Sequence, residues 1–334
     1  MSDFAAFAVE ERTLIRGKPI HYQKLNSLQN WFPIALTPTL EGIWWRHLGN
    51  RRFTESFFSD TLAYIHPEER LSCYTPLEAL ENLPSYVAPT AFIFHISRCG
   101  STLLTQMLAT LPQCIVMSEP PVIDSLLRMP DLSEASAKKM LSGLINALGQ
   151  QRFHEEQKFF IKFDSWHLCH LPLIRSIFPT VPCILLYRQP IEVLNSHRRH
   201  RGPQMIPGWM NATRLNLDTR PLAPGDFDGY CAIVLESYFK CALNSLLSQP
   251  LILLNYQQLP AIFFSHLVDF FSIDCSAKEL ETIQTRSLFN AKHKNDVFTG
   301  DPFIASSQAD IILKERVAPY YEQLEQARLK QNIF

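Results

Sequence analysis

The sequence predicts an α/β fold: a doubly wound, mostly parallel sheet with flanking helices, preceded by an aromatic-rich N-terminal extension. Two observations favour this fold. Short continuous apolar runs alternate with helical patterns from about residue 91 onward, as expected for buried parallel strands joined by helices. The chain of 334 residues is also 46% hydrophobic and 19% charged, which supplies a large core.

The N-terminal segment, residues 1–88, differs from the rest of the chain. It is rich in aromatic residues and is broken repeatedly by proline. Its stretch 44–53 mixes aromatic and basic side chains, which would also suit a surface for a substrate or partner. We expect a small cap that packs its aromatic side chains against the main domain, and we assign residues 89–334 to that domain.

The main domain alternates between the two kinds of element. The expected strands are 91–96, 114–117, 158–163, 182–187 and 250–255. The expected helices are 101–111, 134–150, 167–178, 190–201, 227–248 and 257–271. Ligands of such folds bind at the carboxyl ends of the strands, where the loops gather.

The segment 202–226 interrupts this alternation. It is rich in glycine and proline and also carries large apolar side chains such as Trp209. So long a connection within a compact domain is usually functional or disordered. We expect either a lid over the site or a surface loop without a role in function.

Charge and cysteine content limit the classes of function. The net charge of −1 gives no general attraction to nucleic acid or to an anionic membrane, and no apolar run approaches the roughly 20 residues of a membrane span. The first residues lack the pattern of a secretory signal. Eight scattered cysteines show no metal-binding spacing, so we expect buried free thiols in a cytoplasmic protein.

The stretch 92–104 carries the clearest functional signal. An apolar run passes through the turn Ser97-Arg98-Cys99-Gly100 into a helical pattern that begins with Ser101 and Thr102. A strand, a turn and a helix in this order direct free backbone N–H groups and the positive helix end at one point, which suits a phosphate. Arg98 and the two hydroxyls add side-chain donors.

Two familiar phosphate loops fit this stretch poorly. A Walker A loop has the pattern GxxxxGK[ST], but its first glycine is missing here and Ser101 stands in place of its lysine. A cysteine phosphatase built on Cys99 would need an arginine six residues later, where the chain has Thr105. An ordinary strand-to-helix turn is the remaining alternative.

The stretch 184–201 is the second informative one. An apolar strand ends at Arg188, and Pro190 then starts a helix that contains Ser196. An NTPase of the Walker type would have a magnesium-binding aspartate near this strand end. The guanidinium of Arg188 instead suits an anion. We therefore expect a cationic site that requires no metal.

Taken together, these motifs resemble the sulfotransferases that use 3′-phosphoadenosine-5′-phosphosulfate (PAPS), whose fold is related to that of P-loop NTPases. Residues 97–104 resemble the family's 5′-phosphosulfate loop, and residues 187–196 resemble its 3′-phosphate motif, an Arg-x-Pro followed by a serine eight residues after the arginine. Residues 253–259 resemble its later Tyr-Glu-Asp-Leu signature, with Gln257 and Gln258 in place of the two acids.

The resemblance implies which residues bind the donor. The residues expected at the sulfate-bearing phosphate are Arg98, Cys99, Gly100, Ser101, Thr102 and Leu103. Arg188 and Ser196 are expected at the 3′-phosphate, and Lys292 or Lys294 stands where the family often has one further basic contact. Arg98 would also stabilise charge during transfer.

The resemblance also implies in-line transfer of a sulfuryl group from PAPS to a hydroxyl or amine acceptor, assisted by a general base. Glu119, after the strand at 114–117, is the preferred base, although it could instead cap the next helix. Asp164 follows the strand at 158–163 and is the alternative, in place of the family's histidine. The acceptor itself is not readable from the sequence.

Two other functions compete with this interpretation. One is a P-loop kinase that phosphorylates a small molecule with ATP and magnesium. The other is a catalytically silent member of the same fold that binds a partner.

Overall fold

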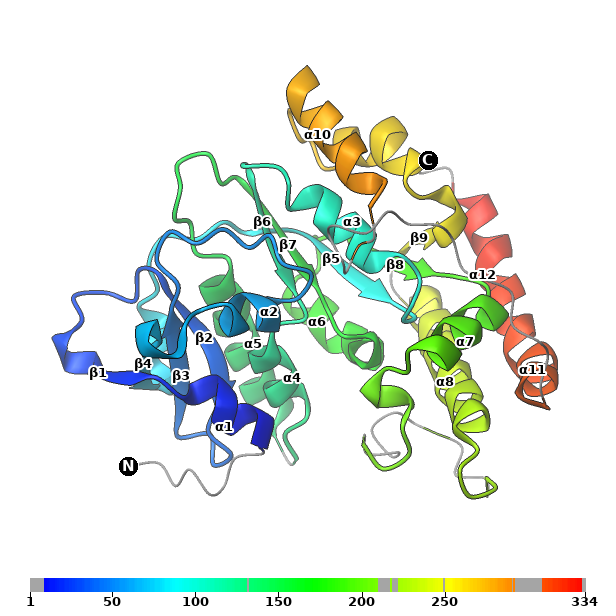
Figure 1. Cartoon of the computed structure of the whole chain (residues 1–334), viewed down its shortest axis with the longest axis horizontal. Coiled ribbons are helices and arrows are strands. Elements are labelled where there is room, and N and C mark those ends of the chain that lie inside the picture. Colours follow the sequence, from blue (N-terminus) through cyan, green and yellow to red (C-terminus); the bar gives the residue numbers. More distant parts are fainter. Residues whose placement is uncertain are drawn as a thin grey trace.

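The structure is a computed structural model, and it describes residues 9–130, 132–209, 217, 222–248, 250–289, 291 and 308–331. Two sheets organise these residues, and Figure 1 shows them side by side with helices around the larger one. No helix among the described residues is long and apolar enough to cross a membrane.

The larger sheet has five parallel strands in the order β6-β7-β5-β8-β9. Their bounds are β5 (Pro89–His95), β6 (Cys114–Ser118), β7 (Lys158–Lys162), β8 (Cys183–Tyr187) and β9 (Ile252–Asn255). All five coincide with apolar runs of the sequence, because strands buried on both faces have no polar face to alternate with. The expected doubly wound α/β fold is thus confirmed.

Helices cover both faces of this sheet. Phe92, Phe94 and Leu185 belong to a large core with most of the helices, whereas Ala91 and Ile93 point to a smaller core on the other face. The larger core involves α4 (Pro121–Leu127), α5 (Glu134–Leu148), α6 (Leu171–Ile177), α7 (Pro190–Arg199), α8 (Phe227–Ser248) and α12 (Ala318–Lys330). The smaller core involves α3 (Ser101–Leu108) and α10 (Ala277–Ser287).

Some helices differ from expectation in form. The expected helix 167–178 is a 3₁₀ helix, Ser165–His170, followed by α6. The expected helix 257–271 contains a π-helical segment, Phe263–Leu267, and the short α9 (Val268–Phe270). Three further short helices are α1 (Val9–Ile15), α2 (Phe58–Ala63) and α11 (Gln308–Ile312).

The smaller sheet is formed by the N-terminal segment and has the strand order β1-β4-β3-β2. Its strands are β1 (Lys18–His21), β2 (Trp31–Leu36), β3 (Gly42–His47) and β4 (Leu71–Pro76). Trp31, Phe32 and Trp45 are buried within the same core that packs on the larger sheet, and β2 contacts α4 and α5. These aromatic side chains therefore serve packing, while the division into two domains at residue 88 stays a prediction.

One expectation about the cysteines is wrong. Cys169 and Cys241 form a disulfide between the 3₁₀ helix Ser165–His170 and α8, with their Cα atoms 5.4 Å apart. The pair is separated by 72 residues, so no local spacing reveals it. The remaining six cysteines are free thiols.

Candidate active site

The residues singled out in the sequence meet at the carboxyl edge of the larger sheet. The loop 96–100 follows β5, Glu119 follows β6, Asp164 follows β7 and Arg188 follows β8. This arrangement results from the parallel order of the strands, which places all their carboxyl ends at one edge.

The loop after β5 has an unusual backbone. Ser97, Arg98 and Gly100 have φ values of 66°, 48° and 83°, all in the left-handed region. A Cβ atom on Gly100 would lie 2.7 Å from Cδ2 of Tyr256, so the close approach of this ring also requires glycine. Because the loop leads directly into α3, the first backbone N–H groups of that helix face the same edge.

Hydrogen bonds to α7 and to the segment after it fix this loop. The Oγ atom of Ser97 lies 3.1 Å from Nε2 of His197 and accepts a hydrogen bond of 3.2 Å from Nε2 of Gln204. The backbone N–H of Gly202 donates to Nδ1 of His197, which assigns the proton of this ring to Nε2 and makes Ser97 the acceptor. Arg98 donates to the carbonyl oxygen of His200 at the end of α7.

Cys99 is fully buried and its thiol donates to the carbonyl oxygen of Leu186 over 3.2 Å. Burial raises the pKa of this thiol to about 12, so it is neutral at physiological pH and unsuited to nucleophilic attack. Because its side chain is buried, Cys99 can offer a ligand only its backbone.

Ser101 and Thr102 are buried at the start of α3, and Leu103 is half-buried beside them.

Arg188 stands at the tip of β8 and is only 8% exposed. Its Nε donates to Oε2 of Glu192 over 2.9 Å, and its guanidinium carbon lies 4.2 Å from the centre of the Tyr256 ring. Tyr256 thus contacts both the glycine of the loop and the arginine of the second motif. Ser196 lies in the same helix as Glu192 and is half-buried.

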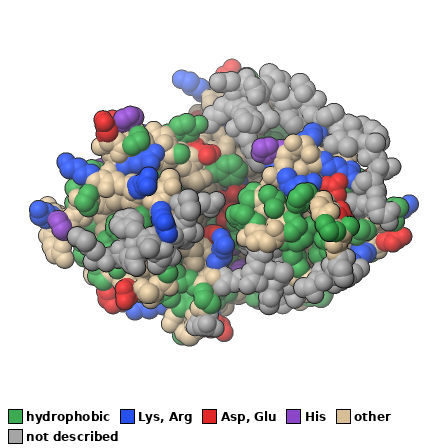
Figure 2. Space-filling view, turned by 60° about the horizontal axis from the view of Figure 1, so that its bottom comes forward, with side chains coloured by type: hydrophobic (Ala, Val, Ile, Leu, Met, Phe, Trp, Pro, Cys, Tyr) green, Lys and Arg blue, Asp and Glu red, His purple; other side chains and the backbone are tan. Residues whose placement is uncertain are grey.

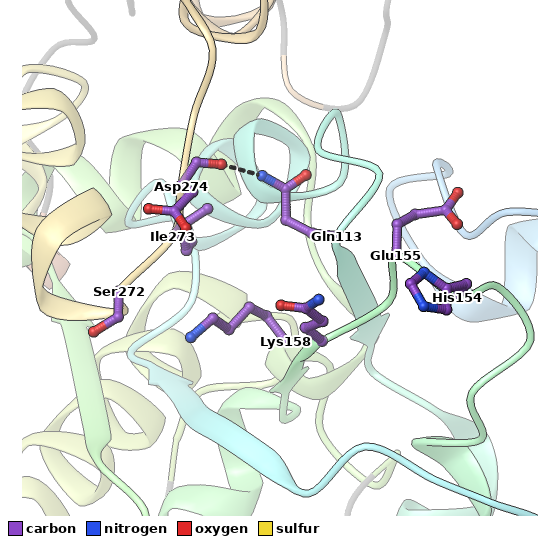
Figure 3. A pocket seen from close by; sticks show the side chains of 8 residues that line it. Gln113, His154, Glu155, Lys158, Ser272, Ile273 and Asp274 are labelled. Carbon is purple, nitrogen blue, oxygen red and sulfur yellow. Dashed lines mark hydrogen bonds between the residues drawn. The ribbon is translucent and has the colours of Figure 1, made fainter.

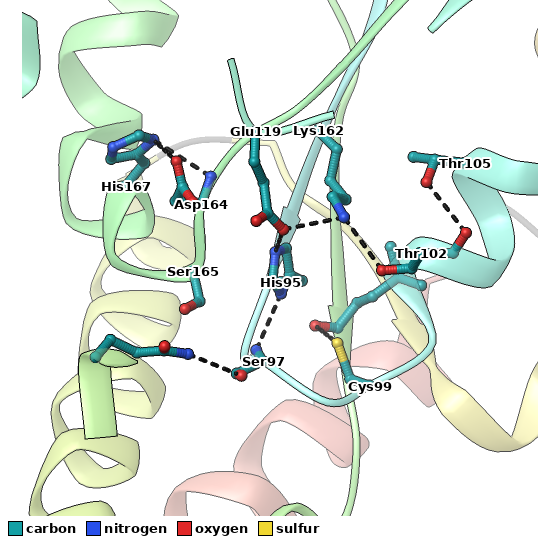
Figure 4. A network of polar contacts seen from close by, with 12 residues as sticks. His95, Ser97, Cys99, Thr102, Thr105, Glu119, Lys162, Asp164, Ser165 and His167 are labelled. Carbon is teal, nitrogen blue, oxygen red and sulfur yellow. Dashed lines mark hydrogen bonds and ion pairs between the residues drawn. The ribbon is translucent and has the colours of Figure 1, made fainter. Parts of the chain in front are cut away.

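Glu119 lies at the centre of a polar network, shown in Figure 4. Its Oε1 is 3.0 Å from the Lys162 ammonium and 3.3 Å from Nε2 of His95. Lys162 is fully buried and also donates to the hydroxyl of Thr102 over 3.2 Å. Burial would raise the pKa of Glu119, but Lys162 and His95 outweigh it and hold this pKa below its usual range.

The structure does not support a capping role for Glu119. The cap residue of α4 is Pro120, and Glu119 has a left-handed backbone with φ of 52°. Its N–H donates to the carbonyl oxygen of Lys162 over 2.7 Å, which ties the two strand ends together. The carboxylate is thereby directed toward Lys162.

Asp164 lies close to Glu119 but has the opposite electrostatic character. Burial, followed by the negative charges of Glu119 and Asp124, raises the pKa of Asp164 well above its usual range. Its Oδ2 lies 3.6 Å from Nδ1 of His167, whose Nε2 lies 3.0 Å from Oδ1 of Asp124. Two neighbouring carboxylates, Glu119 and Asp164, therefore favour different protonation states.

A cavity of about 290 Å³ opens beside these carboxylates. Glu119, Asp124 and Asp164 line it together with Phe57 and Trp166. A second cavity of about 340 Å³ lies at the amino ends of β6 and β7, where Gln113, Lys158 and Asp274 are among its lining residues (Figure 3). It contains none of the residues discussed above.

Some expected features fall wholly or partly outside the described residues. Lys292 and Lys294 do, and so does much of the segment 202–226. The described part of that segment contacts the site at two places. Gln204 bonds to Ser97, and the ring of Trp209 lies 5.7 Å from that of Trp166 at the cavity wall.

Several residues of the site had no role assigned to them from the sequence. Lys162 and His95 end β7 and β5, Asp124 lies in α4, and Tyr256 follows β9. The strand-end position of Lys162 and His95 is a signal that sequence reasoning could have used. Asp124 reaches the site only through the tertiary fold, so no local pattern indicates it. Tyr256 stands in the motif at 253–259, but its contacts with the loop and with Arg188 depend on the tertiary fold.

No protein-family model and no curated protein sequence matches the chain. Five solved structures with a similar arrangement are all sulfotransferases. One from Mycobacterium avium is 11% identical, with a TM-score of 0.44 over 72% of this chain and 78% of that one. One from Alicyclobacillus acidocaldarius is 12% identical, with a TM-score of 0.38 over 73% and 97%.

A mouse sulfotransferase complexed with PAP is also similar, with 12% identity and a TM-score of 0.37 over 74% of this chain and 86% of that one. Because identity and TM-score are both low, the function proposed below rests on the residues of the site.

Proposed function

We propose that this protein is a PAPS-dependent sulfotransferase, which transfers a sulfuryl group in line to an acceptor hydroxyl or amine. One observation carries the proposal: Lys162 joins the helix start of the anion-binding loop, through Thr102, to an ionised carboxylate, Glu119. Transfer of a sulfuryl group needs these two things side by side, an anion site and a proton acceptor.

The residues present suit the donor. The left-handed backbone and the nearby Tyr256 ring require a residue without a side chain at position 100, and Gly100 supplies it. Arg98 and the first N–H groups of α3, with Cys99 contributing only its backbone, face the sulfate-bearing phosphate. Arg188 presents a guanidinium to the 3′-phosphate, with Ser196 in the helix beside it. Lys294 as a further contact stays a prediction.

The proposed reaction breaks one bond and forms one. The acceptor oxygen attacks sulfur, the bond between sulfur and the bridging phosphate oxygen breaks, and the acceptor proton passes to Glu119. Lys162 and the loop N–H groups stabilise the charge that develops on the departing phosphate. As Lys162 is drawn toward that charge, its hold on Glu119 weakens and the carboxylate becomes a stronger base.

Glu119 is the preferred base because its carboxylate is ionised before the acceptor arrives. The raised pKa of Asp164 favours its protonated form, and a protonated carboxyl group would have to lose its proton before it could act as the base. Asp164 then serves to orient the acceptor through a hydrogen bond. The variant Glu119→Gln is expected to bind donor normally and to lose most turnover, whereas unchanged turnover would move the role of base to Asp164.

The decisive experiment compares nucleotides by thermal shift. PAP, the donor without its sulfuryl group, is expected to stabilise the protein without magnesium. Stabilisation by ATP with magnesium alone would instead establish the competing kinase function. Transfer of a labelled sulfuryl group from PAPS to an added acceptor is then measured. Transfer would identify an active enzyme, and its absence would indicate a catalytically silent binding protein of the same fold.

The remaining parts of the proposal concern the cellular setting. We propose an enzyme that needs no metal and acts on a small molecule or glycan, with nucleic acid playing no part. Its cytoplasmic location stays a prediction, and the Cys169–Cys241 disulfide argues against it. Measurement of transfer after treatment with a chelator tests the metal requirement, and a fall in rate that magnesium restores would contradict it.

A further inference from the structure

The cavity beside Glu119 is notable for its charge. Three carboxylates line it, those of Glu119, Asp124 and Asp164, and none of the described residues that line it is a lysine or an arginine. In Figure 2 acidic side chains are visible in the hollow near the centre of the face. The acceptor of the proposed reaction has to enter such a place to reach the carboxylate of Glu119.

Two histidines contact these carboxylates, and a backbone N–H group donates to Nδ1 of each ring. The N–H of Ser97 donates to Nδ1 of His95 over 3.0 Å, so the ring proton is on Nε2 and faces Glu119. Similarly, the N–H of Asp164 donates to Nδ1 of His167 over 3.3 Å, which places the proton on Nε2 toward Asp124. Each ring therefore presents Nε2 to a carboxylate as a hydrogen-bond donor.

Two basic side chains lie near the carboxylates. Lys162 is already paired within the protein, and Arg128 is exposed to solvent. Lys162 is paired with Glu119 and bonded to Thr102. Arg128 lies 3.3 Å from Oδ2 of Asp124, but its side chain is 44% exposed, so solvent weakens this pair. Asp124 therefore keeps a carboxylate at the cavity wall whose arginine partner is exposed, and Asp164 adds a carboxyl group beside it that can accept hydrogen bonds.

Aromatic rings complete the wall on that side. The indole N–H of Trp166 donates to Oδ1 of Asp124 over 2.7 Å, which fixes the ring beside the carboxylate. Phe57 lines the same cavity, and its ring centre lies 4.7 Å from the Lys162 ammonium. Carboxylates combined with aromatic faces are the usual surroundings of a bound ammonium group.

We propose that the acceptor is a small hydroxylated primary amine, whose ammonium group binds between Asp124 and Asp164 beside Trp166 while its hydroxyl lies at Glu119. This inference rests on the proposed function. The ammonium group serves recognition only, and the hydroxyl oxygen forms the new bond to sulfur as its proton passes to Glu119. A volume of about 290 Å³ restricts the acceptor, or the part of it that enters, to a single ring or a short chain.

The test is titration calorimetry with matched pairs of probes that differ chiefly by an amino group: tyramine with 4-ethylphenol, and glucosamine with glucose. Each is titrated with and without saturating PAP. The amine of at least one pair is expected to bind about tenfold more tightly than its neutral partner, as a hydrogen bond to a charged group provides. Equal affinities within both pairs, or no binding of either amine, would overturn the inference.

Two variants sharpen this test. Asp124→Asn keeps an oxygen for Trp166 and His167 but removes the charge, so the preference for the amine should largely disappear. Arg128→Gln removes the competing cation from an exposed position, so the preference should increase. A preference that neither variant alters would overturn the inference as well. Binding of PAP alone reports separately on the proposed function, so the two failures are distinguishable.

Discussion

Arg188 offers the sharpest test of donor recognition. The substitution Arg188→Met removes the guanidinium while a side chain of similar length still packs against Tyr256. Glu192 loses its partner, but its side chain is 40% exposed, so the loss costs under about 1 kcal/mol of stability. We therefore expect a folded protein whose change in affinity reports on the ligand.

The size of the effect follows from the contact that is removed. A hydrogen bond between a charged donor and a phosphate contributes about 1.5–3 kcal/mol, so PAP should bind roughly 10- to 100-fold more weakly. Adenosine 5′-phosphate lacks the 3′-phosphate and should bind the variant and the parent protein equally. The affinity of Arg188→Lys for PAP should lie between that of the parent protein and that of Arg188→Met, because lysine retains the charge but cannot form two parallel hydrogen bonds.

Titration calorimetry with both nucleotides measures these affinities. Arg199→Met, at an exposed position of the same helix, is the matched control and should change neither affinity. An equal loss for PAP and adenosine 5′-phosphate would refute the reasoning, because Arg188 would then not distinguish the 3′-phosphate.

Three further predictions concern the loop and its neighbours. Gly100→Ala forces alanine into a left-handed conformation, which costs about 1–2 kcal/mol, and places its Cβ 2.7 Å from Tyr256. Both the melting temperature and the increase in melting temperature caused by PAP should therefore fall. An unchanged increase with PAP would contradict this reasoning. Cys99→Ala should retain sulfate transfer, and iodoacetamide should not inactivate the folded parent through Cys99, which mass spectrometry of the alkylated protein would check. Asp164 has a raised pKa when folded, so its stabilising contribution is complete below about pH 3.8 and is lost as the pH rises through the folded value. The melting temperature of Asp164→Asn relative to the parent should therefore increase with pH, and a constant difference would argue against the raised pKa.

The strands of the larger sheet were predictable because each is a short apolar run. Helices α7 and α8 were also predicted nearly to their ends, because Pro190 marks the start of α7 and a long apolar pattern indicates α8. The N-terminal sheet was not predictable, because proline such as Pro33 within β2 and aromatic residues on both faces obscure the alternation of a strand.

The site was predictable only as far as the strand ends. Arg98, Glu119 and Arg188 lie at one edge because parallel strands require it, although their roles stay predictions. The partners of these side chains were not accessible, since the pairing of Lys162 with Glu119 depends on the register of β6 and β7. The same holds for the contact of Tyr256 with Gly100, which joins segments more than 150 residues apart.

The bonds from His197 and Gln204 to Ser97 have a consequence for the kinetics of donor binding. They hold the left-handed loop in place through residues of α7 and of the turn after it, without any ligand. A loop ordered in advance loses little conformational entropy when the donor arrives. Association should then occur in one step, at a rate set by diffusion and charge and not by a slow rearrangement of the loop.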